Sequence, residues 1–225
     1  MSFVGIVCGL QSEARAIEKA GKGLPIRIAV SGADTARALK EARKLARGGA
    51  RGLLSAGVAG ALTDGLAPGD LLIADAVVMA DGTRYEADGR WLATLGHKDR
   101  HAVLAGAGEV LATVEDKIAL ARATGASAVD MESHVTAMAA DEAAIPFAAI
   151  RTIADAVDMI MPPLALEAID EKGHTRMGAT LFGMIKSPGQ VPGLMALGRV
   201  SAKAHQGLEE GLTRLLPASC RAVDL

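Results

Sequence analysis

Short, continuously apolar runs alternate with amphipathic segments over the first two thirds of the chain. Apolar runs without alternation are typical of strands that are covered on both faces. The expected strands cover residues 3–10, 26–30, 52–58, 70–79, 101–105, 127–130 and 145–153. The expected helices follow Ser12, which can cap the first of them, and cover residues 33–47, 115–123 and 131–143. This order predicts an α/β fold, a single domain with a mixed, mostly parallel central sheet flanked by helices.

Two segments within this alternation lack a clear strand or helix pattern. Residues 57–60, Gly-Val-Ala-Gly, come at the end of the third strand and predict a glycine-spaced turn. Residues 81–100 are polar and predict irregular structure.

The C-terminal part of the chain has a different pattern. Residues 159–225 are expected to form a divergent helical part of the same domain, because 225 residues suit one large domain better than two. An amphipathic pattern predicts a helix over residues 162–186. Pro188 and Pro192 are then expected to break the chain before a closing helix over residues 194–216.

Composition and charge exclude several classes of protein. Half of the residues are hydrophobic and only 2% are aromatic, which indicates a globular core of aliphatic side chains. The 24 basic and 26 acidic residues nearly cancel, and no Lys/Arg-rich block is present, so a nucleic-acid partner is not expected.

The N-terminal sequence and the cysteines bear on location. Cys8 and Cys220 stand at opposite ends of the chain, which suits a reducing cytoplasm. The apolar start has no charge before Glu13 and so lacks the basic region of a signal peptide. No run is long and apolar enough to predict a transmembrane helix. We therefore expect a cytoplasmic protein, with contact to the inner membrane surface left open.

Two of the candidate chemical positions come early in the chain. Glu13 follows the first strand, and ligands of open α/β sheets gather at the carboxyl ends of strands. The alternative is a helix-start carboxylate stabilised by the helix dipole. Gly57 and Gly60 would let backbone approach a ligand closely, or they could simply form a tight turn.

Two more candidates follow later strands. Glu132 beside Met131 pairs a hydrogen-bond acceptor with a soft apolar surface, which suits a sugar ring, although acids at helix starts are common. Asp155 ends an apolar run, and a buried carboxylate is costly without partners, which indicates a functional role.

Several of these segments together resemble the nucleoside phosphorylase and nucleosidase superfamily. Residues 131–132, 145–147 and 151–155 are similar to the family's Met-Glu, Val-Pro-Phe and Arg-x-Ile-x-Asp signatures. Residues 5–13 resemble the start of methylthioadenosine/S-adenosylhomocysteine nucleosidases, and residues 30–32, 57–60 and 68–71 follow in the family's order. The resemblance spans roughly residues 3–158. Single motifs of this kind are weak, and their order makes them specific.

The resemblance implies cleavage of the N-glycosidic bond of a purine nucleoside, releasing adenine. Asp155 would protonate N7 of the leaving purine, and Glu13 would position or deprotonate the nucleophilic water. Glu132 would accept hydrogen bonds from the ribose hydroxyls while Met131 packs on the sugar. Neither a metal nor an organic cofactor is implied, and the family usually assembles into oligomers. A nucleotide- or lipid-binding module without turnover is the alternative from another class.

Three positions differ from the family pattern and bear on the nucleophile. Val58 stands where the family usually has a Ser that helps to bind the nucleophile or phosphate. Ser55 and Glu13 stand where phosphorylases carry Arg residues. These differences favour hydrolysis over phosphorolysis, but inorganic phosphate stays possible as a co-substrate. The residues that could still form a site for phosphate or water are Gly9, Ser31, Gly32 and Ser55.

The later segments resemble a narrower subfamily, the hopanoid-associated phosphorylases. The similarity rests on residues 130–133, on residues 113–117, which include Val114 as a candidate substrate contact, and on residues 188–192. It implies adenosylhopane, a nucleoside with a large polycyclic lipid tail, as the substrate. The apolar stretch over residues 181–197 could form a groove for such a tail, or equally an oligomer interface or a core helix.

Overall fold

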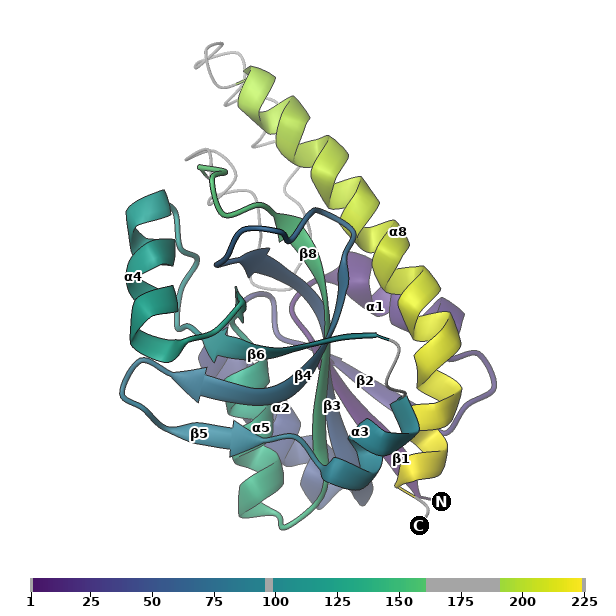
Figure 1. Ribbon diagram of the computed structural model, residues 1–225. Helices are drawn as coiled ribbons and strands as arrows, with labels where there is room; N and C mark the ends of the chain where they lie inside the picture. The colour runs from purple at the N-terminus through teal and green to yellow at the C-terminus, as the bar shows by residue number, and fades with distance from the viewer. Residues whose placement is uncertain (1, 96–98, 161–190, 224–225) are drawn as a thin grey trace.

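The computed structural model describes residues 2–95, 99–160 and 191–223, and these form one α/β domain (Figure 1). The strands are β1 Phe3–Cys8, β2 Ile26–Val30, β3 Ala50–Ala61, β4 Leu71–Met79, β5 Arg84–Glu86, β6 Arg100–Gly106, β7 Ala128–Asp130 and β8 Phe147–Asp155. The helices are α1 Gln11–Ala20, α2 Thr35–Arg47, α3 Gly89–Leu95, α4 Val114–Thr124, α5 Ser133–Glu142 and α8 Val191–Ala222. The expected α/β fold is confirmed.

The strands form one mixed sheet in the order β2-β1-β3-β7-β6-β4-β5, and β8 pairs with both β3 and β4. Pairs β1/β2, β1/β3, β3/β8, β4/β6 and β6/β7 are parallel, while β3/β7, β4/β5 and β4/β8 are antiparallel. The sheet is thus mostly parallel, as predicted. Because β8 bridges β3 and β4, the strands β3, β7, β6, β4 and β8 close into a ring.

Helices cover the sheet on two sides (Figure 1). Alanines of α2 and α5 pack with one set of buried strand residues. On the other side, α1, α3 and the leucines of α8, including Leu208 and Leu212, pack with Ile6, Leu54 and Ile150. The small alanine side chains let α2 and α5 lie close to the strands, which is how a chain with few aromatics fills its core.

The structure corrects the predicted turn at residues 57–60. Strand β3 continues through them, with Gly57 opposite Arg151 and Gly60 opposite Asp155 on β8. Glycine inside a strand can mark a place where another group comes close to the backbone. The two glycines are spaced as in a turn, but here they leave room for the side chains of Glu13 and Asp155 beside the strand.

The segment 81–100 is also more regular than its polarity predicts. It contains β5 and the short helix α3. The carboxylate of Asp88 accepts the backbone N–H groups of Arg90 and Trp91, which starts α3, and Trp91 is then buried. A helix of one or two turns is too short to show a clear hydrophobic periodicity in the sequence.

The helix boundaries differ from the predictions at two places. Leu10, rather than Ser12, stands at the N-cap of α1. Pro192 does not break the chain but lies in the first turn of α8, where a missing N–H costs no hydrogen bond. The expected helix over residues 162–186 and Pro188 lie outside the described residues, as do residues 181–190 of the apolar stretch. None of the described helices combines the length and apolar character needed to cross a membrane.

Candidate active site

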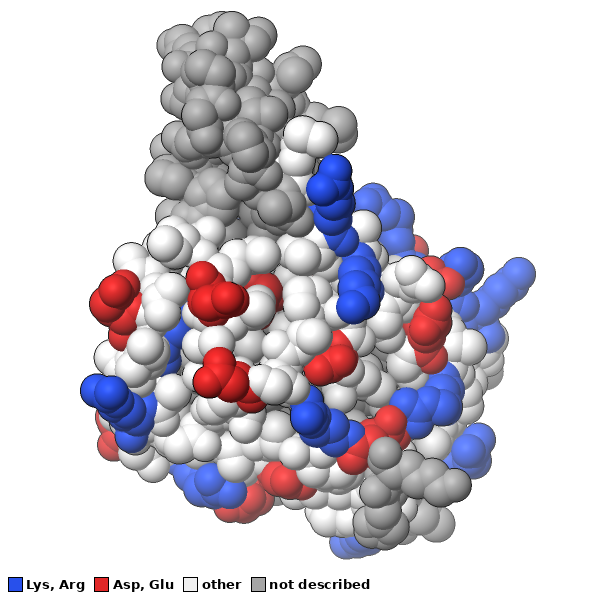
Figure 2. Space-filling view, turned by 45° about the horizontal axis from the view of Figure 1, so that its top comes forward, with Lys and Arg blue, Asp and Glu red and all other residues white. Residues whose placement is uncertain are grey.

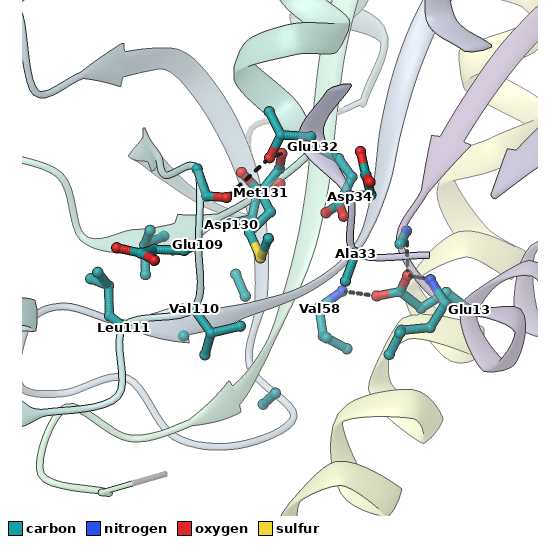
Figure 3. A pocket seen from close by; sticks show the side chains of 18 of the residues that line it. Glu13, Ala33, Asp34, Val58, Glu109, Val110, Leu111, Asp130, Met131 and Glu132 are labelled. Carbon is teal, nitrogen blue, oxygen red and sulfur yellow. Dashed lines mark hydrogen bonds between the residues drawn. The ribbon is translucent and has the colours of Figure 1, made fainter. Parts of the chain in front are cut away.

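A pocket of about 770 Å³ opens at the carboxyl ends of β1, β7 and β8 and along the second half of β3 (Figure 3). Chain segments between β2 and α2 and between β6 and α4 complete its wall, together with residues from the start of α2 and one residue each of α1, α4 and α8. Eight of the residues singled out from the sequence line it: Gly9, Glu13, Gly32, Val58, Gly60, Met131, Glu132 and Asp155. Figure 3 shows Glu13 and Val58 on one side, the segment Asp130–Glu132 above, and Glu109–Leu111 opposite.

Four other residues singled out from the sequence do not line the pocket. Gly57 lies against the Glu13 carboxylate. The Ser31 hydroxyl donates a hydrogen bond to Glu132 Oε1 at 3.2 Å. The Ser55 hydroxyl accepts from the Arg151 guanidinium at 2.6 Å. Val114 begins α4 one turn before Lys117, which does line the pocket. Both serine hydroxyls therefore hold side chains that shape the site.

Backbone N–H groups from the turn after β1 and from β3 hold the carboxylate of Glu13. Gly9 and Leu10 donate to Oε2 at 2.8 Å, and Val58 donates to Oε1 at 2.7 Å (Figure 3). A carboxylate has about four acceptor positions, so roughly one remains for a ligand or water. These bonds fix the side chain at the pocket wall. A water bound there could donate a hydrogen bond to the remaining acceptor position of the carboxylate.

Glu132 is 7% exposed and lies at the start of α5 beside Met131. Burial raises the pKa of its carboxyl to about 8; the nearby Arg151 cation lowers the pKa, while the charges of Asp130 and Glu13 raise it. The group therefore holds its proton near neutral pH. Hydroxyl donors or a developing positive charge in the pocket would favour the ionised form.

This raised pKa predicts a pH-dependent stability. Because the pKa of Glu132 is higher in the folded than in the unfolded chain, its contribution is full below about pH 4.5 and is lost as the pH rises through about 8. Urea unfolding should show that Glu132→Gln gains stability relative to the unmodified chain between about pH 5 and about pH 9, on the order of a few kcal/mol. A constant difference across that range would contradict the assignment.

Asp155 ends β8 and is 5% exposed. Its Oδ2 accepts a hydrogen bond from Lys117 Nζ at 2.5 Å, whereas Oδ1 has no hydrogen-bond partner among the described residues. Burial raises the pKa of the carboxyl, and the hydrogen bond and charge of Lys117 oppose that rise. A buried acid with one free oxygen can deliver a proton to a bound molecule.

Sequence reasoning gave no role to two cations that organise these acids, although both lie within segments that resemble the family. Arg151 is fully buried and pairs with Asp130, while its guanidinium also donates to Ser55 and Ser133. Lys117 comes from the first turn of a helix whose other charged side chains are exposed. A charged residue in an apolar strand was a signal for Arg151, whereas nothing in the local pattern marks Lys117.

Three glycines leave room for the three carboxylates. A Cβ at Gly9 would lie 2.7 Å from Glu132 Oε1, and one at Gly57 would lie 2.5 Å from Glu13 Oε1. A Cβ at Gly60 would lie 3.2 Å from both carboxyl oxygens of Asp155. The glycine that follows β1 and the two glycines of β3 therefore permit the packing of the site.

The pocket is rich in acids. Its described lining has six carboxyl side chains and a single basic one, Lys117. The acids are Glu13, Asp34, Glu109, Asp130, Glu132 and Asp155. Such a wall attracts positive charge that develops in a reacting molecule and repels anions. Across the described part of the chain, no three His, Cys, Asp or Glu side chains are grouped so as to hold a metal ion.

Comparison with known proteins agrees with this architecture. A 5'-methylthioadenosine/S-adenosylhomocysteine nucleosidase of Helicobacter pylori is 18% identical, with a TM-score of 0.73 over 96% of this chain and 98% of that one. Futalosine hydrolase of the same species is 17% identical, with a TM-score of 0.73 over 96% and 97%. The nucleosidase of Neisseria meningitidis is 15% identical, with a TM-score of 0.73 over 96% and 99%. At these identities the likeness shows a shared fold.

The sequence itself carries the family assignment. No curated protein matches the chain by sequence. A family model described as the phosphorylase superfamily matches residues 15–181, about three quarters of the chain. The chain belongs to the phosphorylase superfamily.

Proposed function

We propose that the protein hydrolyses the N-glycosidic bond of a purine nucleoside and releases adenine. The observation that carries this proposal is Asp155, a buried carboxyl with a raised pKa whose Oδ1 is unpartnered among the described residues. The family match and the nucleosidases among the structures of the same fold support it.

The reaction divides between two carboxyl groups. Asp155 gives its proton to N7 of the purine, and the C1'–N9 bond breaks with its electron pair passing to the base. Water forms the new bond to C1' and passes a proton to Glu13. The products are the free purine and the free sugar. Glu132 and Met131 would hold the ribose, and Glu132 would lose its proton to solvent as the ribose hydroxyls bind, so that its carboxylate stabilises the positively charged sugar.

The charge of the pocket favours water over phosphate as the nucleophile. Burial keeps Glu132 protonated and Arg151 pairs with Asp130, so the repulsion comes from the other acids of the described lining, Glu13 above all. The one basic side chain there is already bonded to Asp155. Glu13 stands next to Val58, where phosphorylases bind their anion, and a carboxylate there repels phosphate. Phosphorolysis is the second candidate, because the matching family is described by that reaction.

A product assay with and without inorganic phosphate tests the proposal. Purified protein incubated with adenosine should release adenine and free ribose at a rate that phosphate leaves unchanged. A strict requirement for phosphate, with ribose 1-phosphate as the sugar product, would replace hydrolysis by phosphorolysis. No release of base from a panel of purine nucleosides would overturn the enzymatic assignment and leave a binding module.

The tail of the substrate is proposed from exposed apolar side chains, of which Val110 lines the pocket. Val110 is 43% exposed. Ile118 follows the pocket residue Lys117, and Met195 is 53% exposed on α8, which also supplies Ser201 to the pocket. These side chains would bind an apolar 5' substituent such as the hopane of adenosylhopane, at roughly 25 cal/mol per Å² buried before association costs.

The same exposed side chains fit a protein that works at the inner surface of the membrane or as an oligomer. On the face shown in Figure 2, basic and acidic side chains are interspersed, and the described residues form no continuous basic patch.

In the product assay, the value of kcat/KM for an adenosine with a bulky apolar 5' group should clearly exceed that for adenosine. Equal values would remove the lipid proposal.

A matched pair of glycine variants tests the position of Glu13. Gly57→Ala places a Cβ 2.5 Å from Glu13 Oε1, whereas at Gly108, which also lines the pocket, an added Cβ meets nothing within 4 Å. Displacing a positioned base should cost about tenfold or more in kcat. We therefore expect Gly57→Ala to lose activity and Gly108→Ala to keep it. Equal activity of the two variants would show that the placement of Glu13 is unimportant.

A further inference from the structure

Lys117 is the one basic side chain in the described lining of the pocket, and the proposed reaction does not use it. It is 1% exposed. Its Nζ donates to Asp155 Oδ2 at 2.5 Å and to the backbone carbonyls of Ala156 and Met159 at 2.9 and 3.1 Å. A buried ammonium with a carboxylate and two carbonyls has all three of its N–H groups satisfied.

These contacts define what Lys117 can do. With three acceptors in place, the ammonium has no N–H left for a substrate. It fixes one oxygen of Asp155 and leaves the other, and it ties the chain after β8 to α4 through the two carbonyls. Glu13, Asp130 and Glu132 line the same pocket but form no hydrogen bond or ion pair with Asp155, and its neighbour on β3 is the uncharged Gly60. Within residues 2–95, 99–160 and 191–223, Lys117 is thus the charged group in contact with Asp155.

We propose that Lys117 is a positioning residue for the acid: it aims Asp155 Oδ1 at the leaving purine and stabilises the carboxylate that forms when the proton is given away. The inference rests on the proposed role of Asp155. Proton transfer from the Asp155 carboxyl to N7 leaves a buried anion, which is costly without a partner. An ammonium bonded to Oδ2 neutralises that anion as it forms, with no rearrangement.

Burial and Lys117 shift the pKa of the Asp155 carboxyl in opposite directions, and both shifts serve proton transfer. Burial raises the pKa of its carboxyl, so that a proton is present to give, and Lys117 lowers the pKa, so that the proton can leave. Purine N7 is a weak base, and a general acid is most effective when its own acidity matches the task. Removing the cation should therefore produce an acid that keeps its proton to higher pH but transfers it poorly.

The test compares Lys117→Met with Lys117→Arg over a pH series. Activity on adenosine needs protonated Asp155, so the decline of kcat/KM at high pH should move up by at least about one pH unit in Lys117→Met, while the plateau falls by about tenfold or more. Lys117→Arg keeps the charge and should retain the pH profile of the unmodified enzyme. If Lys117→Met does not fold, Lys117→Gln takes its place. An unchanged pH profile in the neutral variant would overturn the proposal.

A second substrate separates this inference from the proposed function. The leaving group of 4-nitrophenyl riboside is 4-nitrophenolate, a stable anion that departs without being protonated. Lys117→Met should therefore hydrolyse this substrate at the unmodified rate. Equal losses on both substrates would reduce Lys117 to a structural role and overturn the inference. If Asp155→Asn also loses both substrates equally, the acid assignment itself fails.

A readout without substrate completes the test. The ¹³C carboxyl signal of Asp155, identified by its absence in Asp155→Asn, should titrate at higher pH in Lys117→Met than in the unmodified protein. Identical titrations would overturn the inference whatever the activities are.

Discussion

Asp155→Asn is expected to lower kcat for adenosine by about 10²-fold or more, the usual contribution of a general acid. The amide keeps the shape of the side chain and can still accept the Lys117 hydrogen bond, which is 2.5 Å long in the unmodified protein. What it loses is the transferable proton. The base would then have to leave as an anion, and that departure sets the barrier.

The control for this variant is a leaving group that needs no proton. Hydrolysis of 4-nitrophenyl riboside should be little changed by Asp155→Asn, and thermal unfolding should show an intact fold. Near-unmodified turnover of adenosine would show that Asp155 is not the acid. A loss on both substrates would place Asp155 in sugar binding or structure instead.

Glu13→Gln is expected to lose activity on both substrates, by about 10²-fold or more, because both reactions consume water. Gly9 and Leu10 donate to one oxygen of the carboxylate and Val58 to the other. Gln has one oxygen and one NH₂ group, so in either orientation at least one backbone N–H faces another donor. The variant loses the base and part of its anchoring together.

The measurement for Glu13→Gln pairs the two assays with a stability check. Thermal unfolding shows how much of the loss comes from the unpaired backbone donor, which costs about 1–3 kcal/mol. A variant that stays folded and loses both substrates supports Glu13 as the base. Retention of either activity would move water activation elsewhere and reopen the helix-start explanation of Glu13.

Much of the fold could be predicted because its signals are local. Mostly apolar runs mark β1, β2, β4 and β8, and the Ala-rich stretch before Ile145 marks α5. Strand alternation with helices then implies a mostly parallel sheet. The segment 57–60 shows where such signals mislead, because glycine spacing is shared by turns and by strands with close neighbours.

The residues of the candidate site were also predictable only in part. Glu13, Glu132 and Asp155 stand at strand ends in the sequence, and all three line one pocket. The serines could not be placed in this way. The hydroxyl of Ser55 meets a guanidinium 96 residues further along, and that of Ser31 meets a carboxylate 101 residues away. Hydroxyls expected to face a ligand are used inside the protein.

By itself, the sequence determined the class of fold, the positions of most strands and the three acids at strand ends, since strand patterns and strand ends are properties of neighbouring residues. Only the tertiary structure decided the charge state and aim of those acids. The ring closed by β8 brings Lys117 to Asp155 across 38 residues and sets Arg151 beside Asp130 across 21. Burial and partner charge set a carboxyl's pKa, and both depend on groups that are distant in the chain and meet only when the sheet forms.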